Sequence, residues 1–155
     1  MAALLLSACG FRPLYAHGSG GGSAVFTSVY VEPIDAEPGY ELRNSLIDLM
    51  DASNRRANMR YSLKVVLHDQ LQGSALQNDA SITRYNYRLT ADYVLTDNNT
   101  NKPVTNGQAA SLTAYNVVSS PYSTLIAQKD AQKRGAEEIA ERIRLDLSVY
   151  FARVR

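Results

Sequence analysis

The chain has 155 residues, 45% of them hydrophobic, so it can bury a core and fits one domain of ordinary size. Sixteen basic residues against fifteen acidic ones give a formal net charge of +1, which argues against a protein that holds nucleic acid by bulk charge. The single cysteine excludes a disulfide within the chain, so packing alone must stabilise the fold.

The N-terminal segment has the pattern of a bacterial lipoprotein signal. An apolar run from Ala2 to Leu6 precedes the small residues Ser7 and Ala8 and then Cys9. Small side chains give a signal peptidase access to the bond before the cysteine, whose thiol takes the lipid, so we expect cleavage after residue 8 and lipidation of Cys9. The run is short and has no basic residue before it, which we interpret as a start site assigned too late. The alternative is an ordinary buried cysteine.

Composition divides the chain into three segments. Residues 1–8 are the signal segment, which is apparently truncated, and residues 9–24 are the lipidated cysteine with a linker in which glycine and serine dominate. Residues 25–155 contain no repeat and no sign of a second domain, so we expect them to form one α+β domain.

The domain is predicted to begin with a strand and a helix. Valines at positions 25, 29 and 31 indicate a strand over residues 25–31, which Pro33 stops. Pro38 can occupy the first turn of a helix that runs to Asp51. The apolar stripe of this helix recurs at three- and four-residue spacing and is expected to lie in the core: Leu42, Leu46, Leu49 and Met50.

Three more strands are predicted after this helix. Apolar and polar residues alternate over residues 61–67, with His68 at the end of the strand, and again over residues 82–95. The second of these strands places tyrosines and leucines on one face and Arg84 and Arg88 on the other. The turn-forming residues 97–103 then lead into a strand over residues 104–118, so the last two strands should form a hairpin.

A long helix is predicted to close the domain, with Ser120 as N-cap and Pro121 in the first turn. Its apolar stripe runs from Ala136 to Val154. The order β-α-β-β-β-α predicts an α+β two-layer sandwich, with a four-stranded mixed sheet and two helices on one face. The first two strands should be parallel, and the face that carries Arg84 and Arg88 should be uncovered.

The sequence does not indicate an enzyme, a metal site or a bound cofactor. Its two histidines, His17 in the linker and His68 at a strand end, are not placed for a catalytic triad. The acidic residues Glu137, Glu138 and Glu141 lie among basic ones at helical spacing, which is typical of a solvated, ion-paired face. Arg84 and Arg88 could bind an anion or simply solvate an open sheet, and strand periodicity alone favours solvation.

The chain resembles the lipopolysaccharide (LPS)-assembly lipoprotein family (LptE-like) over essentially its whole mature length. Four short motifs carry the resemblance, together with the order of the elements. They are Cys-Gly-Phe-Arg-Pro-Leu-Tyr from Cys9, Leu-Arg-Asn-Ser-Leu at residues 42–46, Ala-Ser-Ile-Thr-Arg at residues 80–84 and Ala-Gln-Lys-Asp at residues 127–130.

The resemblance implies a non-enzymatic lipoprotein on the periplasmic side of the cell outer membrane, held there by N-terminal acyl chains. Its implied partners are LPS and a large β-barrel, the outer-membrane LPS translocon, which it would plug and help to assemble. Gly10, rather than Asp, after the lipidated cysteine is consistent with an outer-membrane destination. The resemblance also implies LPS binding by Arg84 and Lys129, with Arg88 as a further basic residue on the same strand.

A different function class is left open by the residues themselves. The chain could be a stand-alone lipoprotein that faces the periplasm and binds lipid or peptidoglycan without a barrel partner. A free, stable monomer with a closed apolar pocket would favour this alternative.

Overall fold

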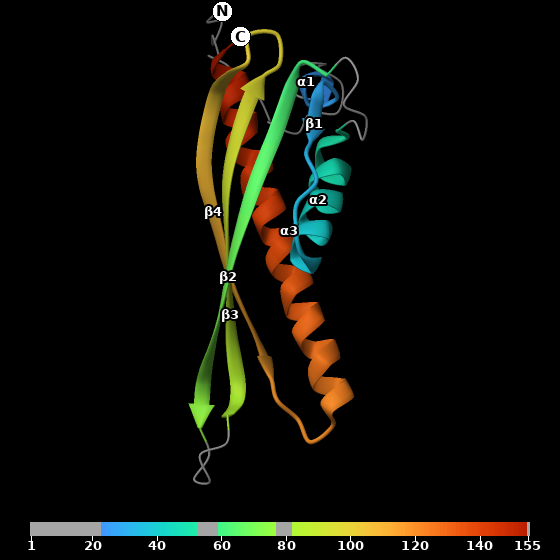
Figure 1. Cartoon of the computed structure of the whole chain (residues 1–155), viewed down its shortest axis with the longest axis vertical. Coiled ribbons are helices and arrows are strands. Elements are labelled where there is room, and N and C mark those ends of the chain that lie inside the picture. The colour runs from blue at the N-terminus through green and yellow to red at the C-terminus, as the bar shows by residue number, and fades with distance from the viewer. Residues whose placement is uncertain (1–22, 53–58, 77–81, 155) are drawn as a thin grey trace, which may run out of the picture.

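The computed structural model describes residues 23–52, 59–76 and 82–154, which form a four-stranded sheet with helices packed against one face (Figure 1). This arrangement confirms the predicted α+β two-layer sandwich. The elements in chain order are α1 (Ser23–Phe26), β1 (Val29–Val31), α2 (Glu37–Met50), β2 (Tyr61–Leu76), β3 (Ile82–Asp97), β4 (Lys102–Asn116) and α3 (Pro121–Arg153).

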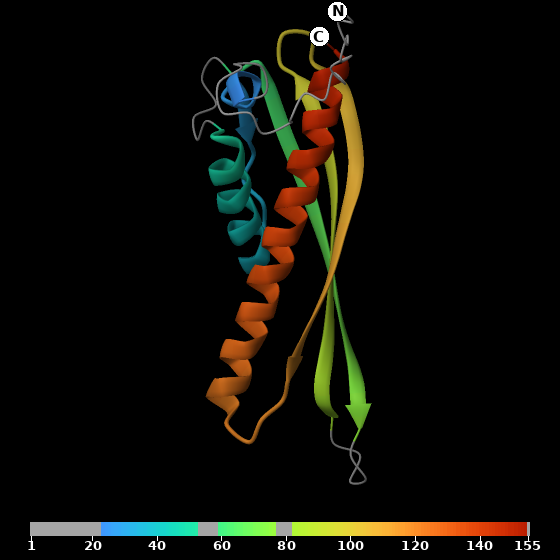
Figure 2. The same ribbon diagram turned by 180° about the vertical axis from the view of Figure 1, so that it is seen from behind.

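The sheet is mixed, as predicted, and its strands follow one another in the order β1-β2-β3-β4. β1 pairs in parallel with the start of β2, from Val29 opposite Tyr61 to Val31 opposite Leu63. The two other pairings, β2 with β3 and β3 with β4, are antiparallel and run nearly the full length of the strands. The sheet is therefore long and narrow, and α3 lies along it (Figure 2).

The strand predicted over residues 25–31 is wrong in its first half. Val25 belongs to α1, and only Val29–Val31 form β1. The Ser28 hydroxyl donates to the Val25 carbonyl oxygen at 2.6 Å, which closes a turn, and Phe26 then packs edge-on against Phe151 of α3 with ring centroids 5.6 Å apart. The turn thus places Phe26 in the core, where a continuous strand would have placed it on the opposite side from Val25 and Val29.

The strand predicted over residues 61–67 is too short. It continues past His68 to Leu76, because β3 pairs with it along this whole stretch. After His68 polar, small and apolar residues are mixed, so the alternation of apolar and polar side chains fades while the backbone pairing continues.

The core lies between the sheet and the two long helices. Leucines on the inner sheet face meet Leu42 and Leu46 of α2 and Ile139, Ile143 and Leu147 of α3, all fully buried. Two residues assigned to the apolar stripes lie outside the core. Leu49 is 38% exposed, and Val154 is 63% exposed because α3 ends before it.

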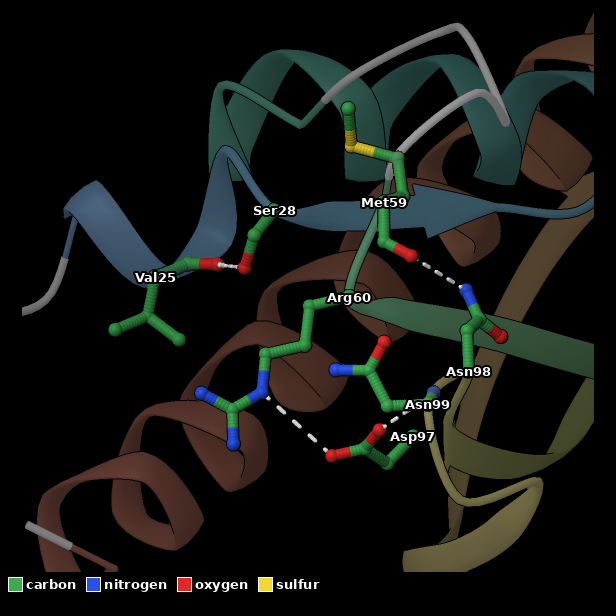
Figure 3. Close-up of polar contacts among 7 residues, drawn as sticks. All are labelled: Val25, Ser28, Met59, Arg60, Asp97, Asn98 and Asn99. Carbon is green, nitrogen blue, oxygen red and sulfur yellow. Dashed lines mark hydrogen bonds and ion pairs between the residues drawn. The ribbon is translucent and has the colours of Figure 1, made fainter.

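A polar cluster joins the β3–β4 turn to the start of β2 (Figure 3). The buried carboxylate of Asp97 accepts from the Asn99 backbone N–H at 2.8 Å, and Arg60 Nε lies 3.6 Å from its other oxygen. Asn98 donates from Nδ2 to the Met59 carbonyl oxygen at 2.8 Å. These contacts satisfy a buried charge and fix the turn at this end of the sheet.

Gly39 in the first turn of α2 provides a stability test. Replacing a helical glycine with alanine normally stabilises a helix, but a Cβ here would lie 2.8 Å from the backbone oxygen of Ile34. We predict that Gly39→Ala lowers the free energy of unfolding by about 1–3 kcal/mol in urea denaturation. The control is Gly135→Ala in α3, where the nearest atom is the hydroxyl of Ser111, which can rotate away, so its cost should be smaller. Equal or greater stability of Gly39→Ala would contradict the packing.

Tyr93 predicts a loss of stability at high pH. Its hydroxyl donates to Asp146 Oδ2 at 2.9 Å, and burial together with this hydrogen bond raises the pKa of Tyr93, while burial and the nearby Asp69 raise the pKa of Tyr87 to about 12. In the unfolded chain both tyrosines ionise above about pH 10, whereas in the folded protein they stay neutral to higher pH. Their contribution to the free energy of unfolding is therefore fully present below about pH 10 and is lost as the pH rises toward 12.

We therefore predict that Tyr93→Phe loses about 1 kcal/mol of stability at pH 7 and shows a shallower decline between pH 10 and 11.5. Tyr40→Phe, at an exposed position, is the control. The measurement is the free energy of unfolding across this pH series, and an unchanged slope for Tyr93→Phe would contradict the assignment.

Candidate functional site

Arg84 and Arg88 lie on the uncovered face of the sheet, as predicted. Tyr87 and Leu89, the residues on either side of Arg88, are buried toward the helices. Because side chains alternate along a strand, Arg84 and Arg88 point to the opposite face. The helices lie only on the inner face (Figures 1 and 2). We call the opposite side, with Arg84 and Arg88, the outer face.

Arg84 lies near the start of β3, opposite Asn116 of β4, and its Nη1 donates to Asn116 Oδ1 at 3.4 Å. Arg88 lies four residues further along, between Gln70 of β2 and Leu112 of β4. At the usual rise of a strand the two Cα atoms are about 13 Å apart, so the two guanidinium groups suit two anionic groups better than one.

The acidic residue of β3 that lies on the outer face with these arginines is Asp92. Asp92 accepts a hydrogen bond from Gln108 Nε2 at 2.7 Å and lies 3.6 Å from His68 Nε2. Its carboxylate is thus already partnered. Lys64 on β2 adds a further positive charge to this face, which is therefore basic overall among the residues that the structure describes.

Lys129 lies in the helix layer and not beside the arginines. Its Nζ donates to Glu37 Oε1 of α2 at 2.8 Å, and this hydrogen bond, with the attraction of the carboxylate, raises the pKa of Lys129. Both side chains are about half exposed, so the pair is an accessible surface contact of small energetic weight. The structure therefore does not bring Lys129 and Arg84 together into one compact site.

The start of β3, the end of β4 and the start of α3 lie at one end of the molecule, which we call the tip (Figure 1). The N-cap of α3 is Ser120, as predicted, since its hydroxyl accepts from the Ser123 N–H at 3.3 Å. A large part of the tip is exposed and apolar. The side chains concerned are Val118, Tyr122, Leu125 and Ile126.

Sequence reasoning missed this apolar patch, although Tyr122, Leu125 and Ile126 have the three- and four-residue spacing of a helix stripe. The pattern showed a stripe, but it could not show that α2 is too short to cover it. An exposed group of large apolar side chains at one end of a domain is typical of a surface that contacts lipid or another protein.

The remaining predicted residues are placed as follows. Cys9 and His17 lie outside the described residues. Glu137 and Glu138 pair with Lys133 and Arg142 along α3, as expected for an ion-paired face. Within the described ranges, no group of three His, Cys, Asp or Glu side chains could hold a metal ion, and no helix is long and apolar enough to cross a membrane.

Comparison with protein families gives one match of direct relevance. The sequence profile of the LptE lipopolysaccharide-assembly family matches residues 26–147, which cover most of the described domain. A relative in Rickettsia prowazekii (strain Madrid E), the uncharacterised protein RP188, is 26% identical over 149 residues, which are 96% of this chain and 92% of that protein.

Solved structures with the same fold include several lipoproteins. A candidate lipoprotein from Caulobacter crescentus CB15 superimposes with a TM-score of 0.71 at 26% identity, covering 87% of this chain and 98% of the other. A minor lipoprotein of Acinetobacter baumannii gives 0.60 at 18% identity, with coverages of 80% and 92%. The rare lipoprotein B of Shewanella oneidensis gives 0.61 at 11% identity, with coverages of 81% and 97%, and these last two show the fold alone.

Proposed function

We propose that this chain, which belongs to the LptE lipopolysaccharide-assembly family, is an outer-membrane lipoprotein that plugs a large β-barrel LPS translocon, assists its assembly and binds LPS. Family membership by itself supports a role in LPS assembly, since the family consists of non-enzymatic envelope lipoproteins associated with the LPS-assembly machinery. The observation that carries the proposal is the family match across the sheet and α3.

The shape of the domain supports a position inside a barrel. α3 has 33 residues, which corresponds to a length of about 50 Å, and the sheet beside it is narrow (Figure 1). The lumen of a large barrel is polar, and the outer sheet face of this domain carries the polar residues Arg84, Arg88, Asp92 and Gln108 beside the exposed Val66, Val94 and Leu112. A long, narrow domain with a polar side is suited to such a lumen.

The position of the N-terminal end of the domain determines which end would face the membrane anchor. α1 and the C-terminal end of α3 lie at the end opposite the tip (Figure 1). With Cys9 lipidated and upstream of α1, the tip would project away from the anchored end. The described start of the domain, α1, and Arg84 therefore lie at different ends of the domain.

The tip and the adjoining outer face support LPS as the ligand. LPS combines phosphates and carboxylates with acyl chains, and the tip combines Arg84 with the exposed apolar patch at the start of α3. The Val117 backbone N–H donates to the Thr83 carbonyl oxygen at 2.9 Å, which holds the chain just before Val118 beside the strand that carries Arg84. Arg88 and Lys129 would contact further anionic groups of a large ligand.

The experiment for the barrel partner is affinity purification of the tagged, acylated protein from outer membranes solubilised in mild detergent. We predict that a much larger β-barrel protein co-purifies in a fixed ratio, and that Cys9→Ala, which lacks the acceptor thiol, leaves the outer-membrane fraction. A lone monomer under conditions that preserve other barrel complexes would favour the stand-alone lipid- or peptidoglycan-binding lipoprotein. An unchanged distribution of Cys9→Ala would contradict the lipid anchor.

The LPS site is tested by reversing charges. We predict that Arg84→Glu weakens binding of purified LPS about tenfold, and that Arg88→Glu and Lys129→Glu weaken it less. Glu37→Gln should strengthen binding, because it releases Lys129 from its ion pair. The control is Arg153→Glu, which makes the same charge change at the end opposite the tip. If all of these variants bound LPS as Arg153→Glu does, the site assignment would be refuted.

A further inference from the structure

β2 is paired on one side along its length and on the other side over only three residues. β3 accompanies it from Tyr61 to Leu76, whereas β1 pairs only with Tyr61–Leu63. The Glu32 N–H still donates to the Leu63 carbonyl oxygen at 3.0 Å, and the next residue, Pro33, has no N–H to continue the ladder. No described strand pairs with β2 on this side beyond that point.

The pairing with β1 shows which backbone groups face the open side. The Tyr61 N–H donates to the Ser28 carbonyl oxygen, and the Leu63 carbonyl oxygen accepts from Glu32. Backbone groups alternate in direction along a strand, and the β2–β3 register is unbroken up to Gly73. The N–H and C=O groups of four residues therefore point away from β3. We call these the open β2 edge: Val65, Leu67, Asp69 and Leu71.

A cavity of about 440 Å³ lies at the upper part of this edge, where the segment after β1 separates from β2. The residues that line it include three acidic ones, Glu32, Asp35 and Asp69, against one basic residue, Lys64, whose side chain points toward the outer face. The cavity is thus acidic and suits a Lys or Arg side chain. Further along the edge, Leu71 is 50% exposed on the inner sheet face, so it offers an apolar contact.

The other free edge of the sheet, that of β4, is different. Arg134 of α3 donates from Nη2 to the Ala114 carbonyl oxygen at 3.5 Å, and Thr113 donates to the Ala131 carbonyl oxygen of α3 at 2.9 Å. The helix therefore partly covers β4. The β2 edge differs from the β4 edge because its unpaired backbone groups lie beside an acidic cavity.

We propose that the open β2 edge takes up an extended loop of the barrel partner as an added strand, an inference that rests on the proposed function. Added strands gain affinity from main-chain hydrogen bonds and specificity from alternate side chains. Every strand in the wall of a closed barrel is already paired on both sides, so the segment must come from a loop, and the loops on one side of such barrels are long. The loop carries a Lys or Arg in the acidic cavity and apolar residues beside Leu67 and Leu71.

The test uses a proline substitution to remove one backbone N–H from the open β2 edge. In Leu71→Pro the lost N–H makes no bond to β3, so the fold should survive, as for proline on edge strands generally. The matched control is Leu112→Pro, because Leu112 is a leucine of similar exposure, 57%, on the β4 edge, and the Ala114 carbonyl two residues on shows that its backbone also points away from β3. In the affinity purification we expect Leu71→Pro to retain about tenfold less barrel and Leu112→Pro to retain the wild-type amount.

A photoreactive amino acid at position 71 provides the second measurement, which needs no proline and covers the case in which Leu71→Pro fails to fold. A cross-link to a peptide from a barrel loop supports the proposal, and a cross-link only to a wall strand, or none, overturns it. Wild-type retention of the barrel by Leu71→Pro, with normal thermal unfolding, also overturns it while leaving the proposed function intact. If the wild-type protein retains no barrel, the proposed function fails first and this inference fails with it.

Discussion

The close contact of α3 with the sheet is the constraint on which the rest of the structure depends. Small residues make it possible: Gly135 lets the helix lie beside the Ser111 hydroxyl, which a Cβ would force to rotate away, and the Ala131 carbonyl oxygen lies near enough to accept a hydrogen bond from Thr113. Because α3 packs on β4 and β3, α2 covers part of the remaining inner face, next to β1 and the start of β2, and leaves Leu71 half exposed. The outer face then has no covering element, and its polar residues stay accessible.

Much of this arrangement could be predicted from periodicity. The alternation along β3 assigned Arg84 and Arg88 to the side opposite Tyr87 and Leu89, and the spacing in α2 identified Leu42 and Leu46 as core residues. The failures occur where backbone pairing or a single contact overrides the local pattern. β2 continues past His68 because β3 holds it, and Val25 is in a helical turn because Phe26 packs on Phe151. Phe151 is far from Phe26 in sequence, and although β3 directly follows β2, the backbone pairing of the two strands leaves no periodic pattern in residues 69–76.

The candidate site shows the same limit more clearly. Arg84 and Lys129 can be read from the sequence as basic residues, but the partner of each depends on tertiary structure. Lys129 pairs with Glu37, which lies 92 residues earlier in the chain, and Arg84 pairs with Asn116 across the sheet. The two cations consequently belong to different layers of the sandwich. A small anion could not bridge them, whereas a ligand with several charged groups and acyl chains could contact the outer face and the tip at once.

An unpaired strand is normally a liability, because it can pair with any exposed strand, and natural sheets protect such edges with charges, bulges or covering elements. β2 has two of these devices. Asp69 places a carboxylate in the row of edge residues, and the register shifts between Gly73 and Ala75 end the regular ladder. The unprotected stretch is therefore reduced to a few residues next to the acidic cavity. A protected edge of this length discourages indiscriminate pairing between copies, since the Asp69 carboxylates would repel each other, but it still accepts a short basic segment. The same side chain would thus both oppose pairing between copies and favour a basic segment.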